Sequence, residues 1–186
     1  MSVLAAVREA TRPLHDALER DLDMVATLAT ASGRRRVLGA FLGVYEPAER
    51  VLLPRLAPIA GLDYAQRLKT ARLRADLAEL GVDAPAIDAL PRSAPPRLAD
   101  AATALGFAYV LEGATLGGRI IRRQALAAGQ SDAGLAFFDF YGPQTGPRWQ
   151  AFCAVLEAQG AEPVAAGAVM GFGYVRAGLL EAAAAA

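Results

Sequence analysis

The chain has 186 residues, of which 54% are hydrophobic and 20% are charged, and this length suits one domain with a sizeable core. Lys and Arg together number 19, as do Asp and Glu, so the formal net charge is zero, which argues against nucleic-acid binding through a basic surplus. One His and one Cys exclude an internal disulfide, a cysteine-rich metal site, and zinc or di-iron centres that need several histidines.

The first two predicted elements are helices, because Ala, Leu and Arg dominate and strand-like alternation is scarce. A first helix is expected over Val3–Asp23. Pro13 interrupts it, and Thr11 is suited to cap a fresh start there. A second helix begins after Ser32-Gly33 and runs toward Leu56, with two prolines that bend or end it.

The rest of the chain is also helical in pattern. A third helix is expected over Tyr64–Leu80, closed by Gly81 in the position after the C-cap. There follow a proline-bearing connection with one short helix (83–96), the longest helix (98–128), an aromatic and glycine-rich loop (133–147), two more helices (148–159 and 162–180) and a short tail that we expect to be flexible (182–186). The sequence therefore predicts a single-domain, all-α helical bundle over residues 1–186.

No targeting or membrane segment is evident in the sequence. The start of the chain carries charged residues and lacks an uninterrupted apolar signal core. The apolar segment 164–180 is interrupted by Arg176 and by glycines, and it is shorter than the roughly 20 apolar residues of a membrane span. We therefore expect a cytoplasmic protein with neither a membrane nor a nucleic-acid partner.

The only histidine lies in a charged pattern. Arg8, Arg12, His15 and Glu19 are spaced four, three and four residues apart, so a continuous helix places them on one face. One imidazole suits heme iron, because the porphyrin supplies four further nitrogens, and the flanking guanidinium groups suit anionic substituents at the edge of a planar ligand. The alternative is that the arginines are solvated surface charges and His15 is a partly buried polar residue.

A second pattern lies within the longest predicted helix. Gly113, Gly117 and Gly118 fall within six residues, and each costs the helix about 1 kcal/mol relative to alanine. Close approach of the backbone to a flat ligand would offset this cost, as would tight helix–helix packing through small residues. A third pattern, the aromatic run 137–141 that includes Phe138, suits either a pocket wall or ordinary core.

Together these three segments resemble the heme oxygenase family, in its bacterial, biliverdin-producing branch, over residues 3–156. Residues 11–24 are similar to the family's proximal helix, with His15 in the place of the axial iron ligand and Glu19 beside it. Arg8 and Arg12 fall where the family places basic residues facing the heme propionates. The segment 41–52 is similar to the family's second long helix, 113–118 to its distal glycine pattern, and 135–140 to its Leu-Ala-Phe-Phe-x-Phe run.

The resemblance implies an enzyme that uses heme as both cofactor and substrate and consumes O2, with biliverdin, CO and iron as products. The implied catalytic residues are Gly113, Thr115, Gly117 and Gly118, and the implied heme contacts are Arg8, Arg12, Glu19, Phe138 and Arg148. Electrons would come from a separate reductase or ferredoxin, because the chain has no flavin or nucleotide fingerprint. A bacteriophytochrome that receives biliverdin is a further implied partner.

One departure from the family pattern bears on turnover. Well-studied members have an aspartate after the first distal glycine, which orders the waters that deliver protons, and this chain has Ala114. A subgroup associated with bacteriophytochromes resembles the version found here. Candidates to order these waters in its place are Thr115, Tyr45, Glu49 and Arg119.

Two alternatives to the enzyme stay open. Ala114 favours a protein of the same fold that stores, senses or transfers heme without cleaving it. A third reading is a helical relative that binds another small molecule, as thiaminase-like and quinone-cofactor proteins do. The lack of further histidines and of a recognisable cysteine nucleophile motif argues against their chemistry, and Cys153 is read as a buried helix residue.

Overall fold

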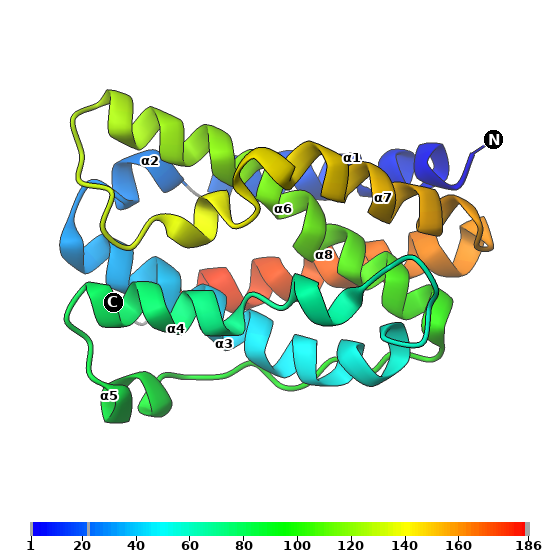
Figure 1. The fold of residues 1–186 in the computed structure, drawn as a ribbon, viewed down its shortest axis with the longest axis horizontal. Coiled ribbons are helices and arrows are strands. Elements are labelled where there is room, and N and C mark those ends of the chain that lie inside the picture. Colours follow the sequence, from blue (N-terminus) through cyan, green and yellow to red (C-terminus); the bar gives the residue numbers. More distant parts are fainter. Residues whose placement is uncertain (1, 22, 185–186) are drawn as a thin grey trace.

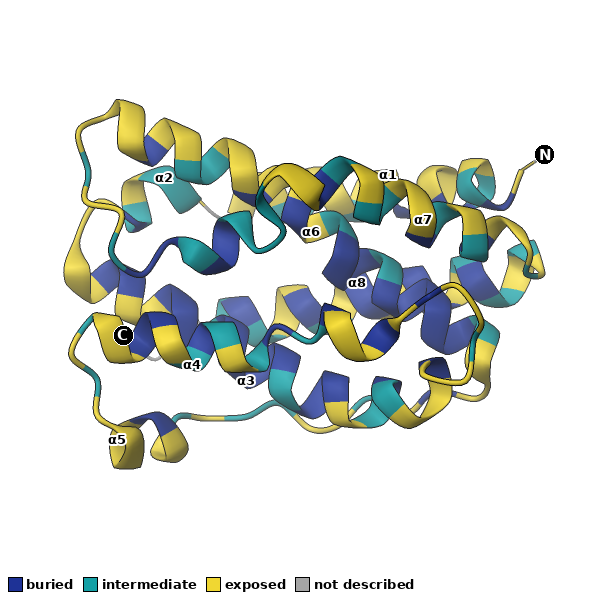
Figure 2. Ribbon diagram, in the orientation of Figure 1, coloured by how far each residue is buried: buried dark blue, intermediate teal, exposed yellow. Residues whose placement is uncertain are grey.

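The computed structural model describes residues 2–21 and 23–184, and every regular element in them is a helix, as predicted (Figure 1). The bundle consists of α1 (Val3–Asp21), α2 (Met24–Thr27), α3 (Ala31–Leu56), α4 (Thr70–Glu79), α5 (Ala84–Ala89), α6 (Ala101–Ala127), α7 (Thr145–Glu157) and α8 (Ala161–Ala184), with short 3-10 turns η1 (Tyr64–Arg67), η2 (Ala136–Asp139) and η3 (Gly142–Gln144). Buried residues line the inward helix faces (Figure 2). The predicted all-α class is therefore confirmed.

Helix α1 is continuous through Pro13, so the expected fresh start at Thr11 is wrong. Thr11 does not cap a new helix, because its hydroxyl donates to the carbonyl of Val7, one turn back, at 2.8 Å. The beginning of α1 is held from a distance, since the Glu157 carboxylate accepts the backbone N–H groups of Val3 and Leu4 at 2.9 and 3.0 Å. An unbroken α1 keeps its charged residues in helical register.

Helix α3 begins slightly earlier than predicted, with Thr30 as N-cap accepting the Gly33 N–H at 3.0 Å. It contains Pro47 and Pro54 and still runs to Leu56, as expected. The neighbouring short helix α5 also fits the prediction of one brief helix in the connection 83–96. Helix α2 was not predicted, because four residues give too little periodicity to recognise.

The helix expected over 64–80 is divided, and this is the clearest departure in the fold. Turn η1 ends at Arg67 and α4 begins at Thr70, while Gly81 follows the C-cap with a φ of +80°, as predicted. The division arises because the Lys69 N–H donates to a carboxylate oxygen of Glu49 at 2.6 Å, a partner outside any helix ladder. A hydrogen bond to a distant residue thus outweighs the local helix propensity on which the prediction of one helix over 64–80 was based.

Helices α6 and α8 share the most extensive helix contact in the molecule. Glycines allow it: a Cβ on Gly106 would lie 1.9 Å from the Val164 carbonyl oxygen, and one on Gly167 would lie 2.0 Å from that of Thr103. Toward the C-terminal end of α8, the larger side chains Phe172, Val175 and Leu179 face a cavity. The first part of α8 therefore packs closely on α6, and the second part lines a cavity inside the bundle.

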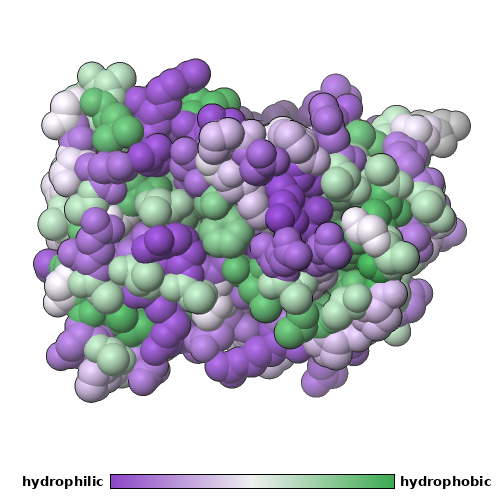
Figure 3. Space-filling view, in the orientation of Figure 1, coloured by the Kyte–Doolittle hydropathy of each residue, from purple (hydrophilic) through white to green (hydrophobic). Residues whose placement is uncertain are grey.

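Helix α8 continues through Ala184, so residues 182–184, expected as part of the tail, belong to it, while 185–186 lie outside the described residues. Of the residues that the structure describes, one segment, Ala161–Glu181, is long and apolar enough to span a membrane. Core helices of globular proteins pass the same test, and α8 packs against α1, α3 and α6. The surface in Figure 3 mixes hydrophilic and hydrophobic residues rather than showing a continuous apolar belt.

Candidate heme site

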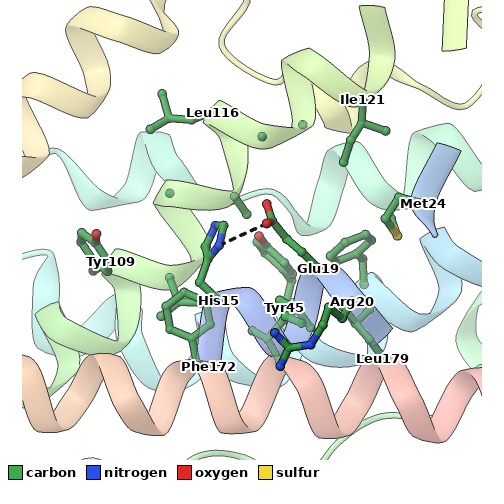
Figure 4. A pocket seen from close by; sticks show the side chains of 18 of the residues that line it. His15, Glu19, Arg20, Met24, Tyr45, Tyr109, Leu116, Ile121, Phe172 and Leu179 are labelled. Atoms are coloured by element: carbon green, nitrogen blue, oxygen red, sulfur yellow. Dashed lines mark ion pairs between the residues drawn. The ribbon is translucent and has the colours of Figure 1, made fainter. Parts of the chain in front are cut away.

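A cavity of about 840 Å³ lies between α1 and α6 and is bordered further by α8, α3, α2 and α7 (Figure 4). Its volume is within the range of sites that hold ligands of several hundred daltons. Its lining is mainly apolar: Leu18, Met24, Val25, Phe41, Val110, Leu116, Ile121, Trp149, Phe172, Val175 and Leu179 take part. The ionisable lining residues come from α1 and from the N-cap of α2, namely Arg8, His15, Glu19, Arg20 and Asp23.

His15 borders the cavity on α1, and its side chain is 56% exposed. Its Nδ1 lies 3.7 Å from a carboxylate oxygen of Glu19, one turn further on, which is close enough for an ion pair and too long for a hydrogen bond (Figure 4). The ring meets Phe172 edge to face at 6.0 Å between centroids. The imidazole is thus supported on one side by an aromatic ring and is free to bind a ligand.

The three glycines of α6 all line the cavity, yet they have different surroundings. A Cβ on Gly118 would lie 2.6 Å from the Phe138 carbonyl oxygen, and one on Gly113 would make ordinary contact with Trp149 at 3.6 Å. A Cβ on Gly117 would meet nothing within 4 Å. Packing therefore explains Gly118, whereas Gly117 leaves open space over the cavity that no protein atom fills.

The structure separates the predicted basic contacts. Arg8 lines the cavity beside Tyr109 and Trp149, whereas Arg12 is exposed and absent from the lining. Arg148 is directed elsewhere: its guanidinium donates to the Gln66 side chain at 2.8 Å and lies over the ring of Tyr141. The cavity thus includes one of the three predicted contacts for an anionic ligand edge.

Other predicted residues lie behind the cavity wall. Thr115 is buried, and its hydroxyl donates to the Glu112 carbonyl at 2.7 Å. Phe138 is buried in an aromatic cluster with Phe41 and Phe137, and Glu49 accepts hydrogen bonds from residues 69 and 70. These three residues are not in the lining.

Arg119, the remaining candidate for ordering waters, pairs with Asp139 at 3.0 Å, away from the cavity.

Tyr45 is the exception among the candidates for ordering water, because it does line the cavity. Its hydroxyl donates to the Leu111 carbonyl at 3.2 Å, within the glycine-bearing helix. Burial raises the pKa of Tyr45 well above its usual value, and the nearby carboxylates of Glu112 and Glu49 add to the rise. The phenol therefore stays protonated and keeps donating its proton to Leu111 of α6.

Sequence reasoning missed several lining residues. Arg20 and Met24 follow the charged pattern on α1, and Trp149 reaches the cavity from α7, where the sequence gives no sign of it. Of these, Arg20 alone had a usable signal, because it lies next to Glu19 at the end of α1. Among the described residues, His15, Asp16 and Glu19 also form an exposed group with metal-ligand atoms, a common arrangement on acidic helix surfaces.

The residues around the cavity fit heme. One imidazole faces a helix whose Gly117 leaves room for a flat ligand, the walls are apolar, and Arg8 offers a cation at an edge. A comparison with curated proteins found no match. The model of the family described as Heme oxygenase matches residues 1–171, which is most of the chain. The chain therefore belongs to the heme oxygenase family.

Proposed function

We propose that this protein is a heme oxygenase that converts heme to biliverdin, CO and iron with O2. Family membership supports heme binding in general. The observation that carries the finer proposal is the pairing across one cavity of a single histidine, His15, with the open backbone at Gly117. Heme bound between them would supply the iron that activates O2 and the ring that is opened.

On the α1 side, each residue has a distinct role in the proposal. His15 would bind the iron through one ring nitrogen, and the nearby carboxylate of Glu19 would orient the ring through the other. Arg8 would pair with a propionate at the aromatic end of the cavity, where Tyr109 and Trp149 also lie. The side chains proposed to bind the iron and a propionate thus all come from α1.

On the α6 side, the proposal relies on backbone rather than side chains. Gly117 would admit the porphyrin face and leave the sixth position of the iron free of protein ligands. Tyr45 also lines the cavity, and its hydroxyl proton is donated to the Leu111 carbonyl, so its oxygen would order water there as an acceptor. Ala114, also in the lining, supplies no polar group.

The proposal also includes an electron donor, a cellular compartment and an acceptor for the product. Electrons would come from an external reductase or ferredoxin, the protein would work in the cytoplasm, and a bacteriophytochrome would be one acceptor of biliverdin.

The test is a titration of the purified protein with hemin, followed by ascorbate or a ferredoxin system in air, monitored by absorption. We expect a one-to-one complex whose Soret band decays as a biliverdin spectrum grows. A Soret band that persists through reduction and oxygenation would refute the enzyme and leave heme binding. No complex at all would refute both.

The second candidate is a heme-binding protein that does not cleave its ligand, and Ala114 favours it. Here Ala114→Asp is the informative variant, because the residue is exposed and borders the cavity, so a carboxylate fits without repacking. If the wild type binds hemin stably and the variant degrades it, the missing carboxylate limits turnover. Equal turnover by both would show that Tyr45 or another group does this work.

A further inference from the structure

A buried ionic cluster surrounds Glu112, the residue of α6 that immediately precedes Gly113. The Glu112 carboxylate accepts from the Arg67 guanidinium at 2.6 Å, from the Lys69 ammonium, and from the Tyr141 hydroxyl at 3.0 Å. The Arg67, Lys69 and Glu112 side chains are 1%, 2% and 3% exposed. None of them lines the cavity, and neither the proposed reaction nor the sequence analysis assigns them a role.

The composition of this cluster is specific. Lys69 is the only lysine among 19 basic residues. An ammonium is compact, and here it lies 5.3 Å from the ring centroids of both Phe140 and Tyr141. The backbone N–H of Lys69 is in turn held by Glu49, so two carboxylates accompany the two buried cations. Loss of Glu112 would leave both buried cations without the carboxylate that pairs with them.

Such a cluster is a poor source of stability, because well-packed apolar residues of similar volume stabilise a core as well or better. Buried ionic groups have instead a demanding geometry, and in some proteins they fix one arrangement of elements. Glu112 lies on α6 and connects this helix to two other segments. One is the end of η1 and the break before α4, through Arg67 and Lys69, and the other is the link between η2 and η3, through Tyr141. The cluster therefore ties α6 to two other segments at this point.

The stretch of α6 that follows, residues 113–118, has one buried side chain, that of Thr115, and its hydroxyl bonds within α6 itself. A Cβ on Gly117 would meet nothing, and Leu116 and Ile120 are 38% and 49% exposed. Firm contacts occur at its two ends. At the far end Gly118 rests on the Phe138 carbonyl, and at the near end Glu112 immediately precedes Gly113.

We propose that Glu112, held by Arg67, Lys69 and Tyr141, is a positioning residue that fixes the cavity-facing stretch 113–118 of α6 opposite His15. The cluster acts through the backbone of α6 and touches no ligand. The inference deepens the proposed function, since it names residues that set the distal wall, and its first test needs no heme.

The test is hydrogen exchange at backbone amides of the ligand-free protein. Tyr141→Phe removes one hydroxyl donor and Lys69→Met removes one cation while keeping an apolar stem. We expect amides 113–118 to exchange about 10-fold faster in Tyr141→Phe, from the loss of one hydrogen bond to a charged group, and faster still in Lys69→Met. Amides in α8 should keep their wild-type rates.

The matched control is Leu73→Ala, a truncation of a fully buried residue in α4 that destabilises the core without touching Glu112. It should accelerate exchange throughout the protected core. The proposal is overturned if the Tyr141 and Lys69 variants show that same uniform acceleration, or if amides 113–118 keep their wild-type rates. Glu112→Gln is the strongest perturbation, and if it does not fold, Tyr141→Phe still decides.

A second readout is the electron paramagnetic resonance spectrum of the ferric hemin complex, which reports the geometry around the iron. We expect one species in the wild type and in Leu73→Ala, and more than one in Lys69→Met. A single unchanged species in all variants would contradict a positioning role. If the wild type fails to bind hemin, the proposed function fails, while the exchange result still decides the role of Glu112.

Discussion

Gly117→Ala should make the ligand-free protein more stable. Gly117 is an exposed residue in the interior of α6, and a Cβ there would meet nothing within 4 Å. The substitution therefore adds helix propensity without a clash, a gain of about 0.8–1.0 kcal/mol. For a chain of this length, that corresponds to a rise in Tm of about 2–4 °C. Gly118→Ala should have the opposite sign, because its Cβ would lie 2.6 Å from the Phe138 carbonyl oxygen.

Thermal unfolding of the ligand-free variants, followed by hemin titration, measures both effects. We expect Gly117→Leu to fold and to lose hemin binding, since its side chain extends into the space that Gly117 leaves open. This combination of intact stability and lost binding would show that the glycine serves the ligand and not the fold. A Gly117→Ala protein less stable than wild type, or a Gly117→Leu protein with wild-type hemin affinity, would refute the reasoning.

Three other predictions concern α1. His15→Ala should leave stability almost unchanged, because the side chain is 56% exposed, and should abolish the axial-ligand signature in the Soret region and turnover; an unchanged spectrum would rule out His15 as the ligand. Arg8→Ala should weaken hemin binding or change the biliverdin isomer found by chromatography, whereas Arg12→Ala, outside the cavity lining, should do neither. The N–H groups of Leu4 and Val3 lower the pKa of Glu157. Its stabilising cap on α1 is therefore present above the ordinary glutamate pKa of about 4.3 and is lost as pH falls through the lower folded value. The Tm advantage over Glu157→Gln should shrink over that range in a pH series, and an advantage constant with pH would contradict the cap.

The parts of the fold that depend on local chemistry were predictable. Periodicity and composition gave the helical class, and Gly81 marked a helix end where its φ of +80° is required. The division at Lys69 was not predictable, because its cause is a hydrogen bond to Glu49, 20 residues away. Pro13 was misjudged for a related reason: α1 is held by α8 and by the Glu157 cap, so its packing outweighs one missing hydrogen bond.

The candidate site shows the same limit. Helical spacing predicted Arg8, Arg12, His15 and Glu19 on one face of α1; Arg8, His15 and Glu19 line the cavity, whereas Arg12 is exposed outside its lining. The glycines were recognised together, yet only coordinates separate Gly118, which packing requires, from Gly117, which it does not. Glu112 was overlooked because a lone glutamate in a helix is usually solvent-exposed, and only its distant partners mark it as buried.

The two helices on either side of the cavity, α1 and α6, contribute different chemical groups. The α1 wall carries the imidazole and the cations, so in the proposed function it would determine whether heme binds and in which orientation. The α6 wall contributes backbone, Ala114 and the nearby Tyr45 hydroxyl, so in the proposed function it would determine whether O2 is used. Because these walls are separate helices, a change at Ala114 on α6 would leave the proposed iron ligand His15 on α1 in place. The proposal therefore treats heme binding and turnover as separable, and it assigns the residues that would distinguish an oxygenase from a heme carrier to the α6 side.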